Sequence, residues 1–344
     1  LYAVKGAEAY HEGRSEDAEA VGIRAPDAHT LLFELEEATS YFIHNLAYYV
    51  LLPVPQHVVQ RHGRRWANAE TIVTNGPFRL AAWERNQFIL LQRNETYHGS
   101  FSGNLAQVQL ALGHRPEEQA ALYEAERLDV ASGWFGALKA IEELRQKYPD
   151  EYVQRPGFIT HYYFVDPTRG PFANRRVRQA LVMAVDRKRL AASYGPGFAV
   201  AATGGFVPPG MPGHLAGCAL PFDVQRAREL LAAAGFAEGL GFPEVILRTV
   251  ERARGRADFL KRSWKRALNI ETRVEIHDTP SVTDAGQEAV VAMGGWIADY
   301  PDPDNFLRVD VQFDIPQWRD KAYLDLLERA SRIADQEERL GLYR

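Results

Sequence analysis

The chain has 344 residues, which is too long for one ordinary core, so we expect two lobes. Hydrophobic residues make up 46% of the chain and charged residues 25%, with a net charge of -5. These values are typical of a soluble globular protein, and no basic cluster indicates a nucleic-acid partner. No apolar run approaches the roughly 18 residues of a membrane helix. The single cysteine, Cys218, excludes an internal disulfide and a cysteine-based metal site.

Strands and helices alternate along the first half of the chain. The expected elements are a strand at residues 30–35, a hairpin at 78–93 that turns near Arg85, a strand at 108–112, a helix at 116–127 and a short strand at 128–131. Proline at the first turn supports the helix, because its missing N–H has no partner there in any case.

The second half continues the alternation after an aromatic run at residues 161–164. We expect a helix from Asn174, its cap, to Gly195, and another at residues 223–235. A β-α-β unit follows: a strand at residues 245–250, a helix marked by Leu260, Trp264 and Leu268, and a strand at 270–276. We assign Trp83 and Trp264 to the core. The alternation predicts an α/β fold, with a lobe boundary near residues 155–165.

Both ends of the sequence lie inside apparent structural patterns. The chain begins without an initiating methionine or a signal peptide, and residues 337–344 stop in the middle of a helical pattern. We therefore expect an internal part of a longer protein, whose location cannot be inferred from a missing signal.

Catalytic and metal-binding patterns are absent from the sequence. The histidines form no His-Glu-x-x-His spacing, and His57 and His62 are five residues apart, which places them on different faces of a helix. Cys218 has no adjacent base. We expect no enzyme activity, no metal site and no cofactor.

Residues 294–303 are the segment best suited to recognition. The diglycine Gly294-Gly295 allows close backbone approach, Trp296 offers a flat apolar wall, and Asp299 can pair with a cation. The alternative from these residues alone is a buried strand that ends in an acidic turn broken by prolines.

Six segments, in order, resemble patterns of the family 5 extracellular solute-binding proteins, the oligopeptide- and dipeptide-binding receptors of ABC importers. They are residues 66–80 with Trp83 and 93–97, residues 171–187, 202–211, 227–236, 295–303 and 335–340. Each pattern alone is weak evidence. The six patterns occur in the order found in the family, and together they span nearly the whole chain.

The resemblance implies a class II periplasmic-binding-protein fold, with two hinge-connected lobes and mixed sheets. Residues 1–160 would be the later part of lobe I and residues 161–344 most of lobe II. A leading part of lobe I and a closing C-terminal segment would lie outside this sequence. The stretch between Ile276 and Met293 is short for the family.

The resemblance also implies a receptor that captures peptides or related small solutes in a cleft between its lobes. The receptor would be a monomer, periplasmic or lipid-anchored outside the cell membrane, and would deliver its ligand to an ABC permease. The backbone of residues 294–296 would pair with the ligand as with an added strand. Asp299 would hold the ligand's α-ammonium group, and Trp296 would wall a side-chain pocket.

Three further residues are weaker candidates for the ligand site. Tyr162 and Tyr163, where the chain crosses between the lobes, would belong to the hinge or cleft, with core packing as the alternative. Asn75 would cap the turn before the hairpin or line the cleft. Sugars, nickel complexes and opines stay open as ligands. The alternative function is a cytoplasmic sensor domain fused to a DNA-binding or signalling domain.

Overall fold

The computed structural model describes residues 2–131, 138–155, 157–194, 197–282, 289–309 and 320–344. The chain divides into two compact units, which are described separately. One combines Leu1–Tyr48 with Gln154–Arg344, and the other is Tyr49–Val153. The predicted lobe boundary near residue 160 divides the chain differently and stays a prediction.

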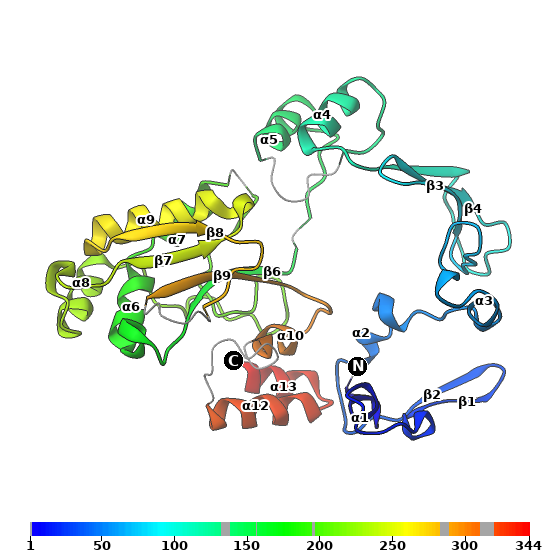
Figure 1. The fold of residues 1–344 in the computed structure, drawn as a ribbon, viewed down its shortest axis with the longest axis horizontal. Coiled ribbons are helices and arrows are strands. Elements are labelled where there is room, and N and C mark those ends of the chain that lie inside the picture. The colour runs from blue at the N-terminus through cyan, green and yellow to red at the C-terminus, as the bar shows by residue number, and fades with distance from the viewer. Residues whose placement is uncertain (1, 132–137, 156, 195–196, 283–288, 310–319) are drawn as a thin grey trace. The chain divides into compact units, whose positions relative to one another are not determined.

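The smaller unit contains an antiparallel sheet of three strands in the order β3-β4-β5 (Figure 1). Its elements are η2 (Tyr49–Leu51), α3 (Gln56–His62), η3 (Gly63–Arg65), β3 (Phe78–Glu84), β4 (Phe88–Arg93), β5 (Gln107–Ala111), α4 (Pro116–Glu124) and α5 (Leu138–Lys147). The predicted hairpin is confirmed, and Asn86 takes the left-handed φ of 60° that its turn needs. The strand predicted at residues 128–131 is wrong: Val130 is 79% exposed, so this segment buries no apolar face.

The larger unit begins with short elements that lead into its main part. They are α1 (Ala7–His11), η1 (Ala18–Ala20), β1 (Ile23–Asp27), β2 (Thr30–Phe33) and α2 (Phe42–Asn45). Strands β1 and β2 form an antiparallel hairpin.

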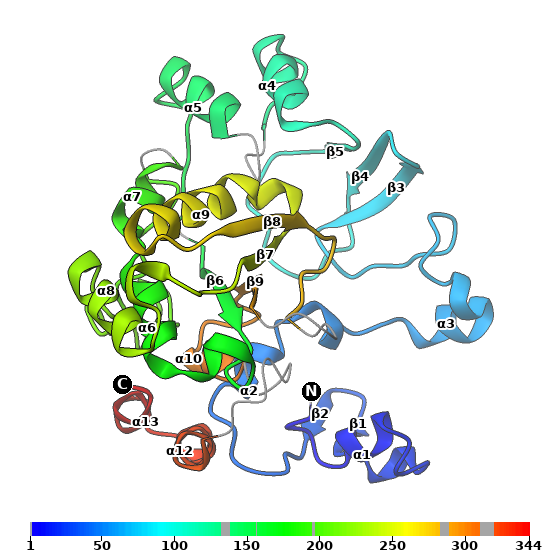
Figure 2. The same ribbon diagram turned by 60° about the vertical axis from the view of Figure 1, so that its left-hand side comes forward.

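A mixed four-stranded sheet forms the centre of the larger unit. Its strands are β6 (Ile159–Val165), β7 (Val245–Thr249), β8 (Thr272–Ile276) and β9 (Val290–Ile297), in the order β6-β9-β7-β8. Strand β9 is antiparallel to β6 and parallel to β7, which is parallel to β8. The surrounding elements are η4 (Gly170–Ala173), α6 (Arg175–Met183), α7 (Arg187–Ala192), α8 (Val224–Ala233), η5 (Ala237–Gly239), η6 (Glu251–Ala253) and α9 (Arg254–Leu268). The predicted β-α-β unit is confirmed as β7-α9-β8, and α9 runs along one face of the sheet (Figures 1 and 2).

Alternate residues of the central strands enter two different cores. Leu247 and Val291 join the large core that includes buried residues of α6, α8 and α9. Their neighbours Ile246 and Ala292 point to the other face and join a smaller cluster. This period of two is what a sheet covered on both faces requires.

The helix predicted from Asn174 to Gly195 is two helices in the structure. Asn174 caps α6 as expected, but the chain leaves the helix after Met183. The Asp186 carboxylate then accepts a hydrogen bond from the backbone N–H of Arg189 at 3.0 Å and starts α7. Gly195 lies outside the described residues.

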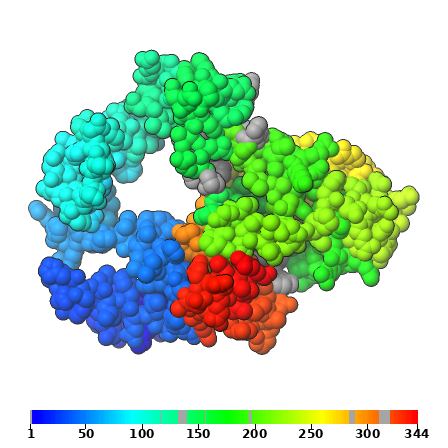
Figure 3. Space-filling view, turned by 180° about the vertical axis from the view of Figure 1, so that it is seen from behind, coloured from blue at the N-terminus to red at the C-terminus, as the bar shows by residue number. Residues whose placement is uncertain are grey.

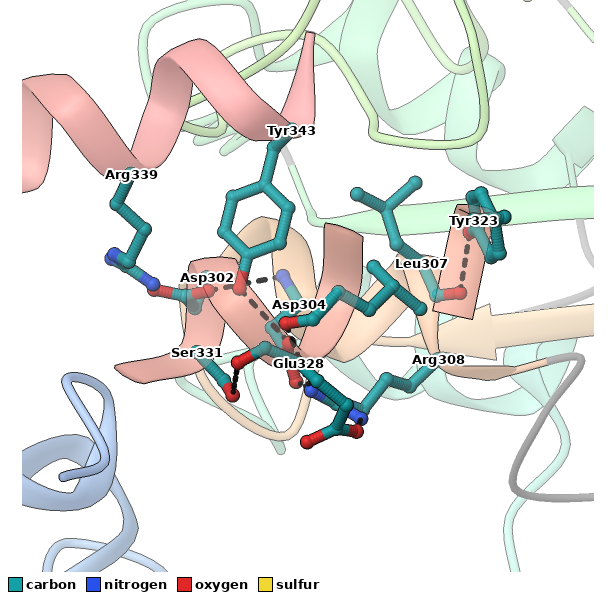
Figure 4. A network of polar contacts seen from close by, with 10 residues as sticks. Asp302, Asp304, Leu307, Arg308, Tyr323, Glu328, Ser331, Arg339 and Tyr343 are labelled. Atoms are coloured by element: carbon teal, nitrogen blue, oxygen red, sulfur yellow. Dashed lines mark hydrogen bonds and ion pairs between the residues drawn. The ribbon is translucent and has the colours of Figure 1, made fainter. Parts of the chain in front are cut away.

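The last helices of the chain enclose a buried polar network with the turn that follows β9 (Figure 4). They are α10 (Pro303–Leu307), α12 (Lys321–Arg332) and α13 (Gln336–Tyr343). Asp302 caps α10, and its Oδ2 also lies 2.6 Å from Nη2 of Arg339. Both side chains are almost fully buried, so each charge depends on the other.

Asp304 is the second charge of this network, and its side chain is fully buried. One carboxylate oxygen accepts a hydrogen bond from Nε of Arg308 at 2.7 Å, and the other accepts one from the hydroxyl of Tyr343 at 2.9 Å. Burial and the Asp304 charge raise the pKa of Tyr343, which keeps this donor protonated. Arg308 also pairs with Glu328 on α12 at 2.6 Å, so this arginine connects α10 to α12.

The N-terminal segment and the C-terminal helices of this unit meet on the face that Figure 3 shows, in blue and red. Glu37 forms an ion pair with Arg332, and the N–H of Ser40 donates to the carbonyl of Ser331 at 3.4 Å. Within the described ranges, none of the helices is long and apolar enough to span a bilayer.

The Trp264 indole forms a hydrogen bond with the C-terminal end of α6, and replacing Trp264 should destabilise the larger unit. Its Nε1 donates to the carbonyl of Leu181 at 3.0 Å, one of the helix-end carbonyls that lack an intrahelical partner. Trp264→Phe leaves this buried carbonyl unpaired and should lower the free energy of unfolding by about 2 kcal/mol in urea. Trp83→Phe is the control. Trp83 is half-buried, so its predicted place in the core is wrong. Its replacement should lower the free energy of unfolding by less than about 1 kcal/mol. Equal losses would contradict the assigned role of Trp264.

Asp304 should contribute far more to stability than the exposed partner of the same arginine. Asp304→Asn removes a charge that is fully buried against Arg308, and should cost about 3 kcal/mol of unfolding free energy. Glu328→Gln removes the carboxylate whose side chain is 52% exposed, and should cost less than about 1 kcal/mol. Urea unfolding of both variants measures the difference, and similar small losses would show that Asp304 does not hold the turn.

Candidate functional site

Strand β9 is longer than the strand beside it, and this leaves part of one edge open. On one side, β6 pairs with β9 from Val291 to the end of the strand at Ile297. On the other side, the pairing with β7 ends at Ala292. Among the described residues, no strand pairs with β9 on that side beyond this point.

The direction of the hydrogen bonds shows which groups face the open edge. The N–H of Ala298 donates to the carbonyl of Phe158 at 2.9 Å, so even-numbered residues of β9 bond toward β6. Because hydrogen bonding alternates along a strand, the N–H and C=O of Gly295 and Ile297 point the other way. These groups can accept a further strand, and Gly295 itself is exposed.

The two glycines also make room for rings of the neighbouring strand. A Cβ atom on Gly294 would lie 2.4 Å from Cε2 of Tyr162, and one on Gly295 would lie 2.9 Å from Nδ1 of His161. Any side chain at Gly294 would therefore displace the Tyr162 ring that lies across it. The diglycine has a role in cross-strand packing that is independent of a ligand.

Asn305 fixes the end of β9 and the start of the following turn. Its Oδ1 accepts hydrogen bonds from Nε1 of Trp296 at 2.9 Å and from the N–H of Asp299 at 3.0 Å. Asn305 is buried at 5% exposure, and α10 holds it in place. The half-buried Trp296 ring packs against the cluster that includes Phe206 and Phe306.

Asp299 is the exposed acidic residue of this turn, in contrast to Asp302 and Asp304. Its Oδ1 accepts a hydrogen bond from the hydroxyl of Tyr48 at 2.9 Å. The carboxylate is therefore oriented by a neutral donor, and the structure places no cation of the described residues against it. An exposed, oriented carboxylate beside an open strand edge can receive a cationic group.

The remaining predicted site residues lie in different surroundings. Tyr162 packs on Gly294 and Phe206, with ring centroids 4.8 Å apart in the second contact. Tyr163 points to the opposite face and packs against the large core, where burial raises the pKa of its hydroxyl to about 12. Asn75 is exposed and lies in the smaller unit, where Asn94 donates to the carbonyl of Gly76 at 2.9 Å. Ligand roles for all three stay predictions.

Positive charge lies near His161, the residue of β6 that pairs with Gly295. Desolvation of the His161 imidazole, with the charges of Arg256 and Arg252, lowers the pKa of His161 to about 4. The histidine is therefore neutral at pH 7, and the arginines supply the charge. Asp299 thus follows the end of β9, whereas Arg256 lies nearer the middle of the strand, with its Nη2 4.0 Å from Sδ of Met293.

Sequence analysis missed two residues of this site. Tyr48 is 251 residues from Asp299, and no local pattern could connect them. Asn305 follows the turn closely, and its amide, two residues after a helix-starting proline, was the only available signal. No group of three or more possible metal ligands occurs in the part of the chain that the structure describes.

The sequence is similar to those of known solute-binding proteins. A family model for bacterial extracellular solute-binding proteins, family 5 (middle part), matches residues 2–312. The chain is 29% identical over 343 residues to the probable deoxycholate-binding periplasmic protein YgiS of Escherichia coli K12, covering 95% of this chain and 62% of that protein. It is 27% identical over 345 residues to the periplasmic oligopeptide-binding protein OppA of Salmonella typhimurium LT2, covering 94% of this chain and 61% of that protein.

A solved structure shows the same likeness. The crystal structure of Haemophilus influenzae OppA in complex with RPPGFSPFR is 25% identical, with a TM-score of 0.72, over 99% of this chain and 69% of that chain. The likeness to solved periplasmic oligopeptide-binding proteins confirms the predicted two-lobed α/β fold class. The chain spans about six tenths of the length of the two curated relatives. Since the family model covers most of the sequence, the chain belongs to the bacterial extracellular solute-binding proteins of family 5.

Proposed function

We propose that this chain is the ligand-capturing part of an extracytoplasmic receptor that binds peptides and delivers them to an ABC permease. The observation that carries the proposal is the open edge of β9 at Gly295 and Ile297, next to the exposed carboxylate of Asp299. A peptide has a backbone that can pair with such an edge and an α-ammonium group that can pair with such a carboxylate.

The open edge of β9 would bind peptides of different sequences. Main-chain hydrogen bonds from Gly295 and Ile297 would recognise features common to all peptides. The ligand's side chains would project alternately above and below the plane of the sheet, with Trp296 as one apolar wall. Of residues 294–296, only Gly295 directs its backbone groups to the open edge, because those of Gly294 and Trp296 face β6. Ile297 is added as the second backbone contact, and Asp299 keeps its proposed role as the ammonium anchor.

The relatives support a peptide ligand more than the alternatives. The Salmonella typhimurium relative is named an oligopeptide-binding protein, and the Haemophilus influenzae protein was solved in complex with the peptide RPPGFSPFR. The relative named as deoxycholate-binding makes a bile acid the second ligand to test. The alternative of a cytoplasmic sensor domain draws no support from relatives named as periplasmic.

The larger arrangement follows the family expectation. We propose residues 1–160 as the later part of lobe I and residues 161–344 as most of lobe II. The receptor would act as a periplasmic or lipid-anchored monomer, without catalysis of its own.

The ligand class is tested by intrinsic tryptophan fluorescence and by thermal shift. The purified protein is titrated with a set of peptides of two to six residues, including trialanine, and with deoxycholate and an oligosaccharide. Saturable binding of peptides supports the proposal. A response to deoxycholate or to the oligosaccharide, with none to any peptide, overturns it.

Asp299→Asn should weaken binding of peptides with a free amino terminus. Losing one partner of a desolvated ammonium–carboxylate contact costs about 3 kcal/mol, which corresponds to roughly a 100-fold rise in Kd for trialanine. Binding of N-acetyl-trialanine should not change, because that peptide has no ammonium group. Asp325→Asn, at an exposed carboxylate on α12, is the control and should bind as wild type. Unchanged affinity in Asp299→Asn would remove the proposed anchor.

Ile297→Pro should weaken peptide binding without unfolding the protein. Proline deletes the N–H that faces the open edge, and this position does not donate to β6. The loss of one main-chain hydrogen bond should raise Kd by about tenfold, measured by calorimetric titration. Ile297→Val keeps the N–H and should bind normally. Wild-type affinity in Ile297→Pro, with an unchanged melting temperature, would show that ligands do not pair with this edge.

A further inference from the structure

Residues 37–48 form a strap that runs beside the turn after β9, and its position is fixed at several points. At its start, Glu37 pairs with Arg332, and the N–H of Ser40 donates to the carbonyl of Ser331. Both contacts attach the strap to the end of α12. These contacts join the start of the strap to residues about 290 positions later in the sequence.

The middle of the strap packs on the turn itself. The ring of Tyr41 stacks on that of Tyr300, with centroids 4.9 Å apart and an angle of 13° between the planes. Phe42, next in the chain, is buried and packs edge-on against Phe33, with centroids 5.5 Å apart. These contacts hold the strap against the turn, although Ile43 of α2 stays 74% exposed.

The far end of the strap reaches the proposed ammonium anchor. The half-buried Tyr48 donates its hydroxyl proton to Oδ1 of Asp299 at 2.9 Å. The backbone of Asp299 is fixed separately, because its N–H donates to Asn305. Oδ2 of Asp299 has no hydrogen bond to any residue that the structure describes. One oxygen is thus held by the protein, and the other is left for a ligand.

We propose that Tyr48 is a positioning residue that orients the Asp299 carboxylate for a free α-ammonium group and so sets the preference for peptides with an unblocked amino terminus. This inference rests on the proposed function. An aspartate on an exposed turn otherwise samples several rotamers, and the entropy lost on fixing one rotamer weakens binding. With Tyr48 in place, this ordering is complete before the ligand arrives.

The test compares free and blocked peptides in Tyr48→Phe, which keeps the ring and removes the donor. Calorimetric titration should show about a tenfold weaker Kd for trialanine and no change for N-acetyl-trialanine. A general loosening of the strap would weaken both peptides alike. Tyr41→Phe is the matched control in the same strap: it keeps the ring that stacks on Tyr300 and should preserve both affinities.

A double variant separates positioning from packing. If Tyr48 acts through Asp299, Asp299→Asn with Tyr48→Phe should bind trialanine no more weakly than Asp299→Asn alone. Additive losses would overturn the assignment, as would unchanged trialanine affinity in Tyr48→Phe. Either result would leave the receptor function intact. No binding of any peptide in the set by the wild-type protein would instead overturn the proposed function and, with it, the role of Tyr48.

Discussion

The unequal pairing of β9 is the constraint on which the candidate site depends. Strand β6 pairs with one side of β9 from Val291 to Ile297, while β7 pairs with the other side only as far as Ala292. The first half of β9 is therefore buried in two cores, and the second half is paired with β6 alone and has an unpaired edge. An open edge is usually a hazard, because it attracts strands of other chains. Here it is short, and it ends at an acidic turn and prolines that prevent its continuation.

Three carboxylates follow this edge within six residues, and burial separates their roles. Asp302 and Asp304 are buried against Arg339 and Arg308, and they hold α10 against α12 and α13. Asp299 is exposed and accepts only from neutral donors among the described residues. The buried pairs keep the backbone of the turn in one conformation. The backbone from which the exposed Asp299 carboxylate projects is therefore held in place. A site that must meet a ligand's charge gains from such preorganisation.

Sequence patterns predicted the elements that depend on local periodicity and capping. The β7-α9-β8 unit, the hairpin with Asn86 in its turn and the cap at Asn174 all follow from neighbouring residues. The break between α6 and α7 was missed because an apolar pattern continues across it, although Asp186 can start a new helix. The strand predicted at residues 128–131 has no strand partner among the residues that the structure describes. For the site, sequence patterns singled out Asp299 and the β9 segment. The contact from Tyr48 depends on tertiary packing, which no local pattern encodes.

The glycines of β9 show why one residue can serve packing and recognition together. Gly294 is required by the Tyr162 ring across the strand, which contacts Phe206 and so extends the apolar cluster around Trp296. Gly295, one position on, directs its backbone groups to the open edge. The same pair of residues thus makes room for the Tyr162 and His161 rings of β6 and presents backbone groups at the open edge. In the proposed receptor, backbone pairing is common to every peptide, and selectivity is left to the charge at Asp299 and the residue that orients it.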